Sequence, residues 1–158
     1  MRILFAEDQD KQLIKELFIR EWNSDLMVSR GYSHYVENLQ SILAVDINDK
    51  ILGILTYHQA NNEIEIVSLD SFDEGKGIGT KLLDFALLHF KSLDPKRVWL
   101  ITSNDNCNAI RFYQKRGWEM VNIHLNTISE ARKVKPEIPL IGYDGIPILH
   151  EIEFEYNL

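Results

Sequence analysis

The hydrophobic positions of this chain change their spacing from segment to segment, and the spacing predicts where strands and helices lie. Short runs that are apolar or that alternate with polar residues predict strands, whereas apolar residues three or four positions apart predict helices. Strands are expected at 2–6, 41–47, 51–59, 63–70, 97–102, 118–125 and 148–156. Helices are expected at 77–91 and 106–116, with a helical turn at 128–134. A first helix follows the first strand, with its buried face at Leu13, Ile14, Leu17, Phe18 and Trp22.

The connections between these elements predict the fold class. Because a helix crosses between strands 63–70 and 97–102, those two strands are expected to be parallel. Strands 41–47, 51–59 and 63–70 are joined by short turns and are expected to be antiparallel. The prediction is therefore an α/β (α+β) fold, with one mixed, mostly antiparallel sheet of about seven strands and helices on both faces.

Three segments carry weaker patterns. Segment 23–40 has no clean period and is either a short helix or an extended loop. Segment 135–147 holds three prolines and two glycines, so it is expected to be an ordered loop. In the last strand the alternation places three glutamates outward and the apolar residues inward. These outward residues are Glu151, Glu153 and Glu155, and the inward ones are Ile152, Phe154 and Tyr156.

Length and composition exclude several classes of protein. A chain of 158 residues suits one domain, 1–158, and 45% hydrophobic with 26% charged residues is typical of a globular protein. No apolar run reaches the length of a membrane span, and the N-terminus lacks the apolar core of a signal peptide. The single Cys107 rules out an internal disulfide, which favours a cytoplasmic location. No Cys/His cluster has metal-binding spacing, so no metal is expected.

Charge is distributed unevenly along the chain. The net charge of −7 argues against nucleic-acid binding, which requires a basic face. Between residues 75 and 117, however, the chain contains eight basic and only three acidic residues, which gives a local charge of +5. This segment is either a site for an anionic ligand or a solvated charged surface.

A glycine-rich turn lies at the start of this basic segment. Gly75, Gly77 and Gly79 alternate with other residues between an expected strand and an expected helix. A loop of this kind exposes backbone N–H groups at the positive end of a helix dipole, which is a site for phosphate. The spacing matches neither G-x-x-x-x-G-K-[ST] nor G-x-G-x-x-G, and a turn without a ligand is the alternative.

A second informative stretch, 106–118, reads N-C-N-A-I-R-F-Y-Q-K-R-G-W. Together the two stretches resemble the GNAT superfamily of acetyl-CoA-dependent N-acetyltransferases over roughly 41–125. The family's pyrophosphate loop, Q/R-x-x-G-x-G/A, is matched by E-G-K-G-I-G at 74–79, where Glu74 departs from the usual Gln or Arg. The family's second motif, N-x-x-A-x-x-F-Y-x-x-x-G-F/W, is matched by Asn106, Ala109, Phe112, Tyr113, Gly117 and Trp118.

The resemblance implies a site for acetyl-CoA as cosubstrate. The pantetheine arm is expected to pair with the backbone at 67–71, and the phosphates are expected on the glycine loop. Asn106 is expected to hold the arm, although an Asn that opens a helix is often only a cap. The residues implied in cofactor binding are Val67, Leu69, Glu74, Gly75, Lys76, Gly77, Ile78, Gly79, Thr80, Asn106 and Tyr113.

Two residues are candidates for catalysis. Tyr113 matches the family's tyrosine near the cofactor sulfur and is the expected general acid, with a Tyr packed under the sheet as the alternative. Glu65 is the expected general base, directly or through water, with a solvated strand charge as the alternative. The polar–apolar phase slips at Ile66–Val67, which predicts a β-bulge that frees backbone N–H groups for a ligand. A strand buried on both faces would give the same pattern.

The predicted function is transfer of an acetyl group from acetyl-CoA to a primary amine by direct attack in a ternary complex. The acceptor is a small molecule or a protein, with no nucleic acid or membrane partner, and a homodimer is left open. The alternative is a non-catalytic acyl-CoA sensor or interaction module. Segment 126–150 is expected to bind the acceptor, and segment 22–35 is the alternative. The side chains offered by 126–150 are Arg132, Lys133, Lys135, Tyr143 and Asp144.

Overall fold

The computed structural model describes residues 1–73 and 75–158. Glu74, which is implied in cofactor binding, lies outside the described residues. The elements follow one another as β1 (Arg2–Phe5), η1 (Asp8–Asp10), α1 (Lys11–Trp22), β2 (Leu26–Ser29), β3 (Tyr32–Tyr35), η2 (Val36–Asn38), β4 (Gln40–Val45), β5 (Ile51–Ala60), β6 (Glu63–Ser71), α2 (Ile78–Leu93), β7 (Arg97–Ser103), α3 (Cys107–Gln114), β8 (Glu119–His124), α4 (Thr127–Val134), η3 (Tyr143–Gly145) and β9 (Glu151–Tyr156).

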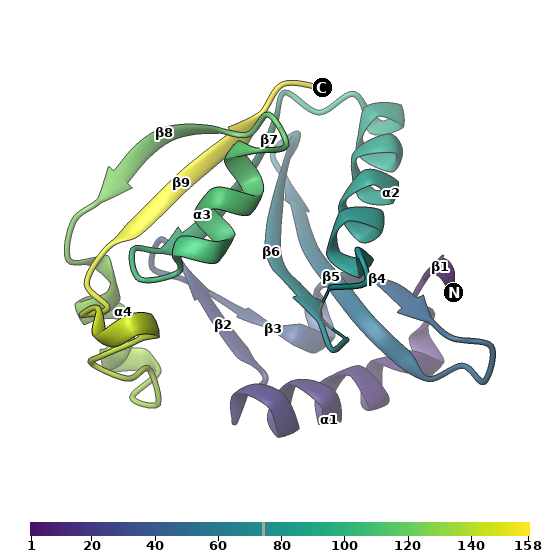
Figure 1. Ribbon diagram of the computed structural model, residues 1–158, viewed down its shortest axis with the longest axis horizontal. Coiled ribbons are helices and arrows are strands. Elements are labelled where there is room, and N and C mark those ends of the chain that lie inside the picture. Colours follow the sequence, from purple (N-terminus) through teal and green to yellow (C-terminus); the bar gives the residue numbers. More distant parts are fainter. Residues whose placement is uncertain (74) are drawn as a thin grey trace.

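Seven strands form one twisted sheet, shown in Figure 1, in the order β1-β4-β5-β6-β7-β9-β8. Strands β6 and β7 are parallel, and every other pair of neighbours is antiparallel. The predicted fold class, the seven strands and the parallel pair are therefore confirmed. A separate two-stranded sheet joins β2 and β3.

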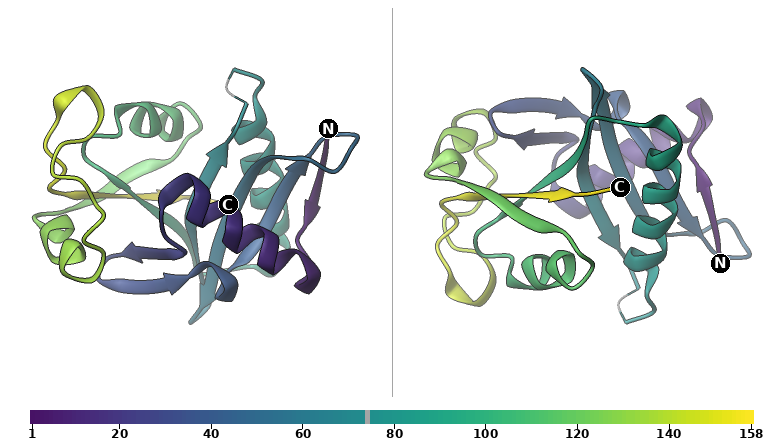
Figure 2. Two further views of the ribbon diagram at one scale, coloured as in Figure 1. Left: turned by 90° about the horizontal axis from the view of Figure 1, so that it is seen from below. Right: turned by 90° about the horizontal axis from the view of Figure 1, so that it is seen from above.

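Helices cover both faces of the large sheet (Figure 2). Helices α2 and α3 pack on one face. Helix α2 does so through an apolar stripe of Leu82, Leu83, Ala86 and Phe90. Helix α1 and the β2–β3 hairpin cover the opposite face. The expected buried face of α1 is correct in its centre and wrong at its ends.

Helix α1 buries only the middle of its predicted apolar face. Ile14, Leu17 and Phe18 are buried, whereas Leu13 and Trp22 are 53% and 44% exposed. Trp22 is the last residue of the helix, and it borders a cavity in the sheet described below. Its exposure therefore follows from its position beside an open cavity, and not from a break in helical periodicity.

Segment 23–40 is a short hairpin followed by a helical turn, and not the single helix or loop that the sequence left open. Ser29 pairs with Tyr32, which leaves Arg30 and Gly31 as the two turn residues, and both have positive φ, 48° and 80°. Two-residue turns with positive φ at both positions match the twist of antiparallel strands. Each strand has only four residues and is partly exposed, so no period is visible in the sequence.

Two of the three glutamates expected to face solvent on β9 are buried. Glu151 and Glu153 are each 3% exposed, because the β2–β3 hairpin covers the face that the alternation assigned to solvent. The backbone N–H of Arg30 donates to Glu151 at 3.1 Å. The direction of the side chains was predicted correctly, and the prediction that this face is open was wrong.

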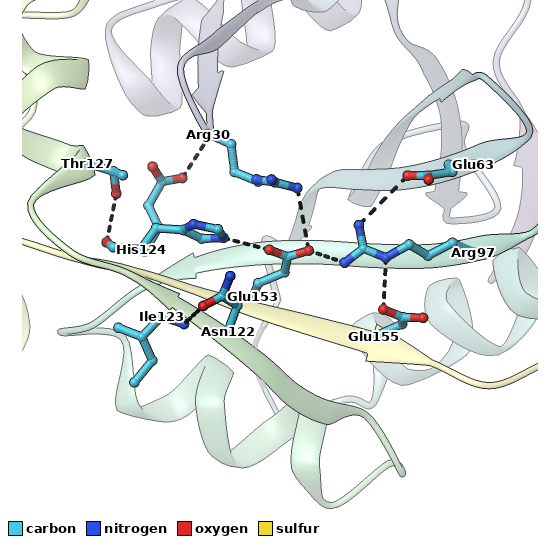
Figure 3. Close-up of polar contacts among 10 residues, drawn as sticks. Arg30, Glu63, Arg97, Asn122, Ile123, His124, Thr127, Glu153 and Glu155 are labelled. Carbon is cyan, nitrogen blue, oxygen red and sulfur yellow. Dashed lines mark hydrogen bonds and ion pairs between the residues drawn. The ribbon is translucent and has the colours of Figure 1, made fainter.

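Glu153 lies at the centre of an ion-pair network under the hairpin (Figure 3). It accepts hydrogen bonds from Arg97 and from His124, the latter at 2.6 Å, and lies 3.6 Å from Arg30. Burial alone would raise the pKa of Glu153, but the hydrogen bonds from Arg97 and His124 outweigh it and lower the pKa. Arg97 also donates to Glu155 at 2.8 Å. The network ties the hairpin to β7, β8 and β9.

Segment 135–147 is ordered, as its prolines predict, and hydrogen bonds from Arg132 hold it in place. The guanidinium of this side chain donates to the backbone carbonyls of Ile138, Pro139 and Ile148, at 3.2, 2.7 and 2.6 Å. Arg132 therefore fixes the loop to the start of β9, and its charge is directed at backbone rather than at an open surface.

Candidate functional site

The glycine loop before α2 is open to solvent on the side that a ligand would approach. Gly75 and Gly77 have φ of 77° and 70°, a region that side-chain-bearing residues rarely adopt. A Cβ built at either position meets nothing within 4 Å. Gly77 is the N-cap of α2, so the first N–H groups of that helix have no acceptor within the helix. This geometry suits an anion.

The side chains around the loop differ in what they offer. Ile78 is 2% exposed, so only its backbone can face a ligand. Lys76 pairs with Asp73 at 2.6 Å on the surface. Gly79 faces the Phe112 ring of α3, where an added Cβ would lie 3.8 Å from the ring.

A basic side chain from the turn after α3 reaches this loop and was not singled out in the sequence. Arg116 donates from Nη2 to the Thr80 hydroxyl at 2.5 Å, and its guanidinium lies 3.7 Å over the Phe112 ring. A positive charge is thus fixed next to the N-terminus of α2. The signal in the sequence was the local charge of the segment, which does not distinguish Arg116 from the other bases.

Strands β6 and β7 part at the end of the sheet where β6 leads into the glycine loop. Their parallel pairing ends at Ile66 and Leu100, although both strands continue. At that point Tyr57 of β5 pairs with Ile66 while Thr56 pairs with Ser68, so Val67 is the extra residue of a β-bulge. The bulge that the sequence predicts is therefore present. Beyond it, the edge of β6 that faced β7 has no strand to pair with.

A cavity of about 190 Å³ lies where the two strands part. Val67 and Leu69 of β6 line one wall, and Asn106 and Tyr113 of α3 line another. Trp22, from the end of α1, also borders it. The structure therefore brings together four residues that the sequence assigns to the cofactor.

Tyr113 is buried at this cavity, with 8% of its surface exposed. Burial raises the pKa of its phenol, and the nearby carboxyl of Asp70 raises the pKa further. The phenol is therefore protonated at all physiological pH values and can donate a hydrogen bond. The raised pKa also makes the phenol reluctant to give up its proton completely.

Asp70 borders the same cavity and was not recognised in the sequence as more than the end of a strand. Its Oδ2 atom is buried without a hydrogen-bond partner among the described residues. Burial raises the pKa of Asp70 from 3.8 to about 6; the hydroxyl of Ser68 lowers it, and the charge of Glu21 raises it. A carboxyl with this pKa changes charge in the mildly acidic range.

Asn106 has a structural role at the cavity. It is the N-cap of α3, and its Oδ1 accepts a hydrogen bond from the backbone N–H of Ala109 at 3.0 Å. The side-chain amide group makes no hydrogen bond to the described part of the chain, so it remains available to a ligand. The two interpretations of Asn106 from the sequence are therefore compatible.

Glu65 is a buried residue and not the solvated strand charge that was the alternative interpretation. It is 5% exposed, and its Oε2 lies 3.2 Å from Nε2 of His34 on β3. His58 pairs directly opposite Glu65 in the β5–β6 register. The three potential ligand atoms lie within 4.8 Å of one another. No local spacing in the sequence predicts this cluster, because it draws on three strands.

Glu65 links two further cavities to the first. It borders one of about 260 Å³, which shares Val67 and Met27 with the Tyr113 cavity, and one of about 290 Å³ that contains Tyr32 and Trp99. The shared lining residues place the three cavities next to one another along β6. We call them together the β6 groove, and define it by Tyr32, His34, Glu65, Val67, Leu69, Asp70 and Tyr113.

Segment 22–34 covers the β6 groove, whereas segment 126–150 was expected to bind the acceptor. Trp22 borders the first cavity, Met27 the second, and Arg30 and Tyr32 the third. Ile128 of α4 reaches the groove. In the part of the chain that the structure describes, no residue of 135–147 lines these cavities.

The remaining side chains offered for acceptor binding lie elsewhere on the surface. Lys133 pairs with Glu130 at 2.7 Å, and Tyr143 is 57% exposed on η3. Burial lowers the pKa of Lys135. Gly142 packs so tightly on the carboxylate of Asp105 that a Cβ would collide with it. These contacts explain the order of the loop without an acceptor.

No helix in the described ranges 1–73 and 75–158 is long and apolar enough to cross a membrane.

Known proteins resemble this chain in sequence and in structure. A model of the acetyltransferase (GNAT) family matches residues 8–118. The uncharacterized protein YxbD of Bacillus subtilis (strain 168) is 39% identical over 152 residues, which are 96% of each chain.

Two solved structures share the fold. The IAA acetyltransferase from Bacillus cereus ATCC 14579 has a TM-score of 0.78 at 21% identity, over 99% of both chains. A GNAT family acetyltransferase from Elizabethkingia anophelis with acetyl-CoA bound has a TM-score of 0.73 at 21% identity, over 99% of this chain and 97% of the other. The family match over most of the chain, together with the parted strands and the open glycine loop, shows that this chain belongs to the GNAT family of acetyltransferases.

Proposed function

We propose that the protein transfers the acetyl group of acetyl-CoA to a primary amine by direct attack within a ternary complex. The observation that carries this proposal is the β6 groove, which extends from Asp70, near the end of β6 that leads to the glycine loop, past Tyr113 to the buried carboxylate of Glu65. The structure from Elizabethkingia anophelis, which has acetyl-CoA bound, supports the same cosubstrate here.

The cofactor occupies the part of the groove between β6 and α3. Its phosphates accept hydrogen bonds from the backbone around Gly75, Gly77 and Thr80, with the charge of Arg116 beside them. The pantetheine arm runs along Val67 and Leu69, where β6 has lost β7 as a partner. A free strand edge offers N–H and C=O groups at the spacing that an amide-containing chain requires.

The reaction requires the amine to be neutral and the departing sulfur to be stabilised. Glu65 takes a proton from the acceptor ammonium, and the neutral amine attacks the thioester carbonyl carbon. The C–N bond forms and the C–S bond breaks, while Tyr113 donates a hydrogen bond to the sulfur as negative charge develops on it. The attacking nitrogen loses its second proton to water, and water returns a proton to the phenol where the phenol has protonated the sulfur. The raised pKa of Tyr113 makes stabilisation of the thiolate its main contribution, and the proton that ends on CoA sulfur then comes from the phenol or from water.

The acceptor enters from the side of the groove under segment 22–34. Glu65 is common to the two cavities there, so an amine in either one lies against the proposed base. Two acidic residues, Glu63 and Glu65, and one basic residue, Arg30, border the cavity of about 290 Å³, and this excess of negative charge attracts a positively charged amine. These features favour a cationic acceptor.

The experiment is turnover of acetyl-CoA with a panel of primary amines, in the presence of EDTA. Tyr113→Phe keeps the packing of the ring and removes the donor, so kcat should fall about 10²-fold while the Kd for acetyl-CoA changes little. Glu65→Gln should lower kcat by a similar factor. The matched control is Tyr156→Phe, since Tyr156 packs on Trp118 away from the groove.

Two results would contradict the proposal. Binding of acetyl-CoA without turnover of any amine would favour the non-catalytic sensor. Unchanged kcat in Tyr113→Phe would remove the role of the phenol and leave water as the donor.

A further inference from the structure

We propose that His34, His58 and Glu65 form a binding site for a divalent transition-metal ion, Zn²⁺ above all, on the acceptor side of the β6 groove. The three side chains come from β3, β5 and β6, and each offers one ligand atom. These atoms lie within 4.8 Å of one another.

The polar atoms of the cluster lack the partners that buried atoms normally have. The side chains of His34 and Glu65 are 11% and 7% exposed. Nε2 of His34 is 3.2 Å from Oε2 of Glu65, but the contact does not have hydrogen-bond geometry. Nε2 of His34 and Oε1 of Glu65 therefore have no hydrogen-bond partner among the described residues. Leaving such atoms unsatisfied destabilises the folded state, and one bound cation would satisfy both.

The set of donors is one that zinc prefers. Zn²⁺ binds imidazole nitrogen and carboxylate oxygen, and sites with three protein ligands keep a fourth position for water or substrate. The adjoining cavity of about 290 Å³ supplies space for that fourth ligand. Tetrahedral coordination places ligand atoms ~3.4 Å apart, so the cluster needs to close by about 1 Å, which side-chain rotation provides.

The sheet and the hairpin position the three ligands in advance. His58 and Glu65 are direct partners in the β5–β6 register, so their backbones are fixed relative to each other. The hairpin that carries His34 is tied down by Arg30, through Glu151 and Glu153. The rings of His34 and His58 are already close, with centroids 4.9 Å apart. Little ordering therefore remains to oppose binding.

A bound ion would also affect acetyl transfer, and this consequence alone rests on the proposed function. If Glu65 is the base, an ion on its carboxylate prevents it from accepting the proton of the amine. Zn²⁺ should therefore inhibit transfer in competition with the acceptor and not with acetyl-CoA. Metal binding itself is independent of whether the protein transfers acetyl groups.

The test is a calorimetric titration of the metal-free full chain with Zn²⁺ alone, without acetyl-CoA or acceptor. We expect one Zn²⁺ per chain for the wild type. His34→Gln and His58→Gln should each weaken binding at least tenfold, because each removes one ligand. His89→Gln is the matched control and should bind as the wild type does, since His89 contacts Phe5 and Tyr57 outside the cluster.

Two measurements keep the test decisive if a variant is unstable. Thermal melts of the metal-free proteins show whether each variant folds, and Zn²⁺ should raise the Tm of the wild type and of His89→Gln only. Co²⁺ added to the wild type should give the visible absorption of a tetrahedral nitrogen and oxygen site. Absence of Zn²⁺ binding by the wild type, or equal binding by His34→Gln and His58→Gln, would overturn the proposal.

Discussion

The glycine loop and the hairpin end of the β6 groove are stabilised in different ways. At the glycine loop the backbone around Gly75 and Gly77 is open, and the first N–H groups of α2 have no acceptor within their helix. At the opposite end the positive charges of Arg30 and Arg97 are balanced by Glu153 and Glu155 near the hairpin. The first region therefore leaves its N–H groups to a ligand or to water, while in the second the unpartnered buried atoms among the described residues belong to Ser29, His34 and Glu65.

This difference separates ligand binding from stability. An exposed glycine loop adds little to the free energy of unfolding. Substitutions in it should therefore alter the affinity for CoA and leave the fold intact. A buried ion pair that loses one partner leaves an uncompensated charge, which costs about 3–5 kcal/mol. Substitutions at the acceptor end therefore have to avoid the Arg97–Glu153 network if they are to report on binding.

The same division explains what could be predicted from the sequence. The glycine loop, the bulge at Val67 and the helix that carries Tyr113 are each formed by residues close together in the chain, so a local pattern reveals them. Family resemblance then assigns their roles. The predicted strands and the parallel pair depend on the same local patterns, and they are confirmed.

The acceptor end depends on residues that are distant in the chain. Glu153 is buried because Arg30, 123 positions earlier, lies over it. Alternation along β9 shows which way the side chain points but not what covers it. The cluster of His34, His58 and Glu65 forms only once the hairpin folds onto the sheet, so spacing along the chain could not indicate it.

The largest expected effect tests the open end. Gly77→Asp places a negative charge at the proposed phosphate site, where repulsion of about 3 kcal/mol corresponds to ~10²-fold weaker CoA binding by calorimetry. Gly77→Asn is the matched control, because Asn has the same shape and tolerates positive φ but carries no charge.

Both Gly77 variants should fold, since an added Cβ meets nothing within 4 Å and both Asn and Asp tolerate positive φ. Gly77→Asn should retain most of the affinity, and Gly77→Asp should lose it. Equal affinity of Gly77→Asp and the wild type would show that the phosphates lie elsewhere, and that the loop is a turn without a ligand.

A smaller effect is expected at Asp70, in the middle of the groove. Burial raises the pKa of its carboxyl from 3.8 to about 6, so between those values the native state holds a proton that the unfolded state has released. Below pH 3.8 the raised pKa leaves the free energy of unfolding unchanged. As the pH rises from there to about 6, it lowers the free energy of unfolding progressively. Asp70→Asn should therefore gain stability over the wild type by about 1–3 kcal/mol between pH 4 and pH 7.

Urea unfolding at pH 4.5 and pH 7.5 measures this difference. The groups that face Asp70 are Glu21 of α1, Ser68 of β6 and Tyr113 of α3, and none of them is altered in the variant. The exposed Asp84 provides the control, because Asp84→Asn should shift stability equally at both pH values. A difference for Asp70→Asn that does not change with pH would show that its carboxyl is hydrated in solution.

The smallest expected effect decides which segment recognises the acceptor. Tyr32 on the hairpin and Tyr143 on η3 are both well exposed, at 70% and 57%, but only Tyr32 borders the cavity that contains Glu65. Tyr32→Ala should raise the KM of the acceptor about 3–10-fold, as expected for loss of one aromatic contact of about 1 kcal/mol. Tyr143→Ala should leave that KM unchanged, and neither variant should alter the KM of acetyl-CoA. The reverse result, with Tyr143 affecting the acceptor and Tyr32 not, would return recognition to segment 126–150. Because both tyrosines can be removed without opening a buried cavity, the comparison reports on recognition and not on stability.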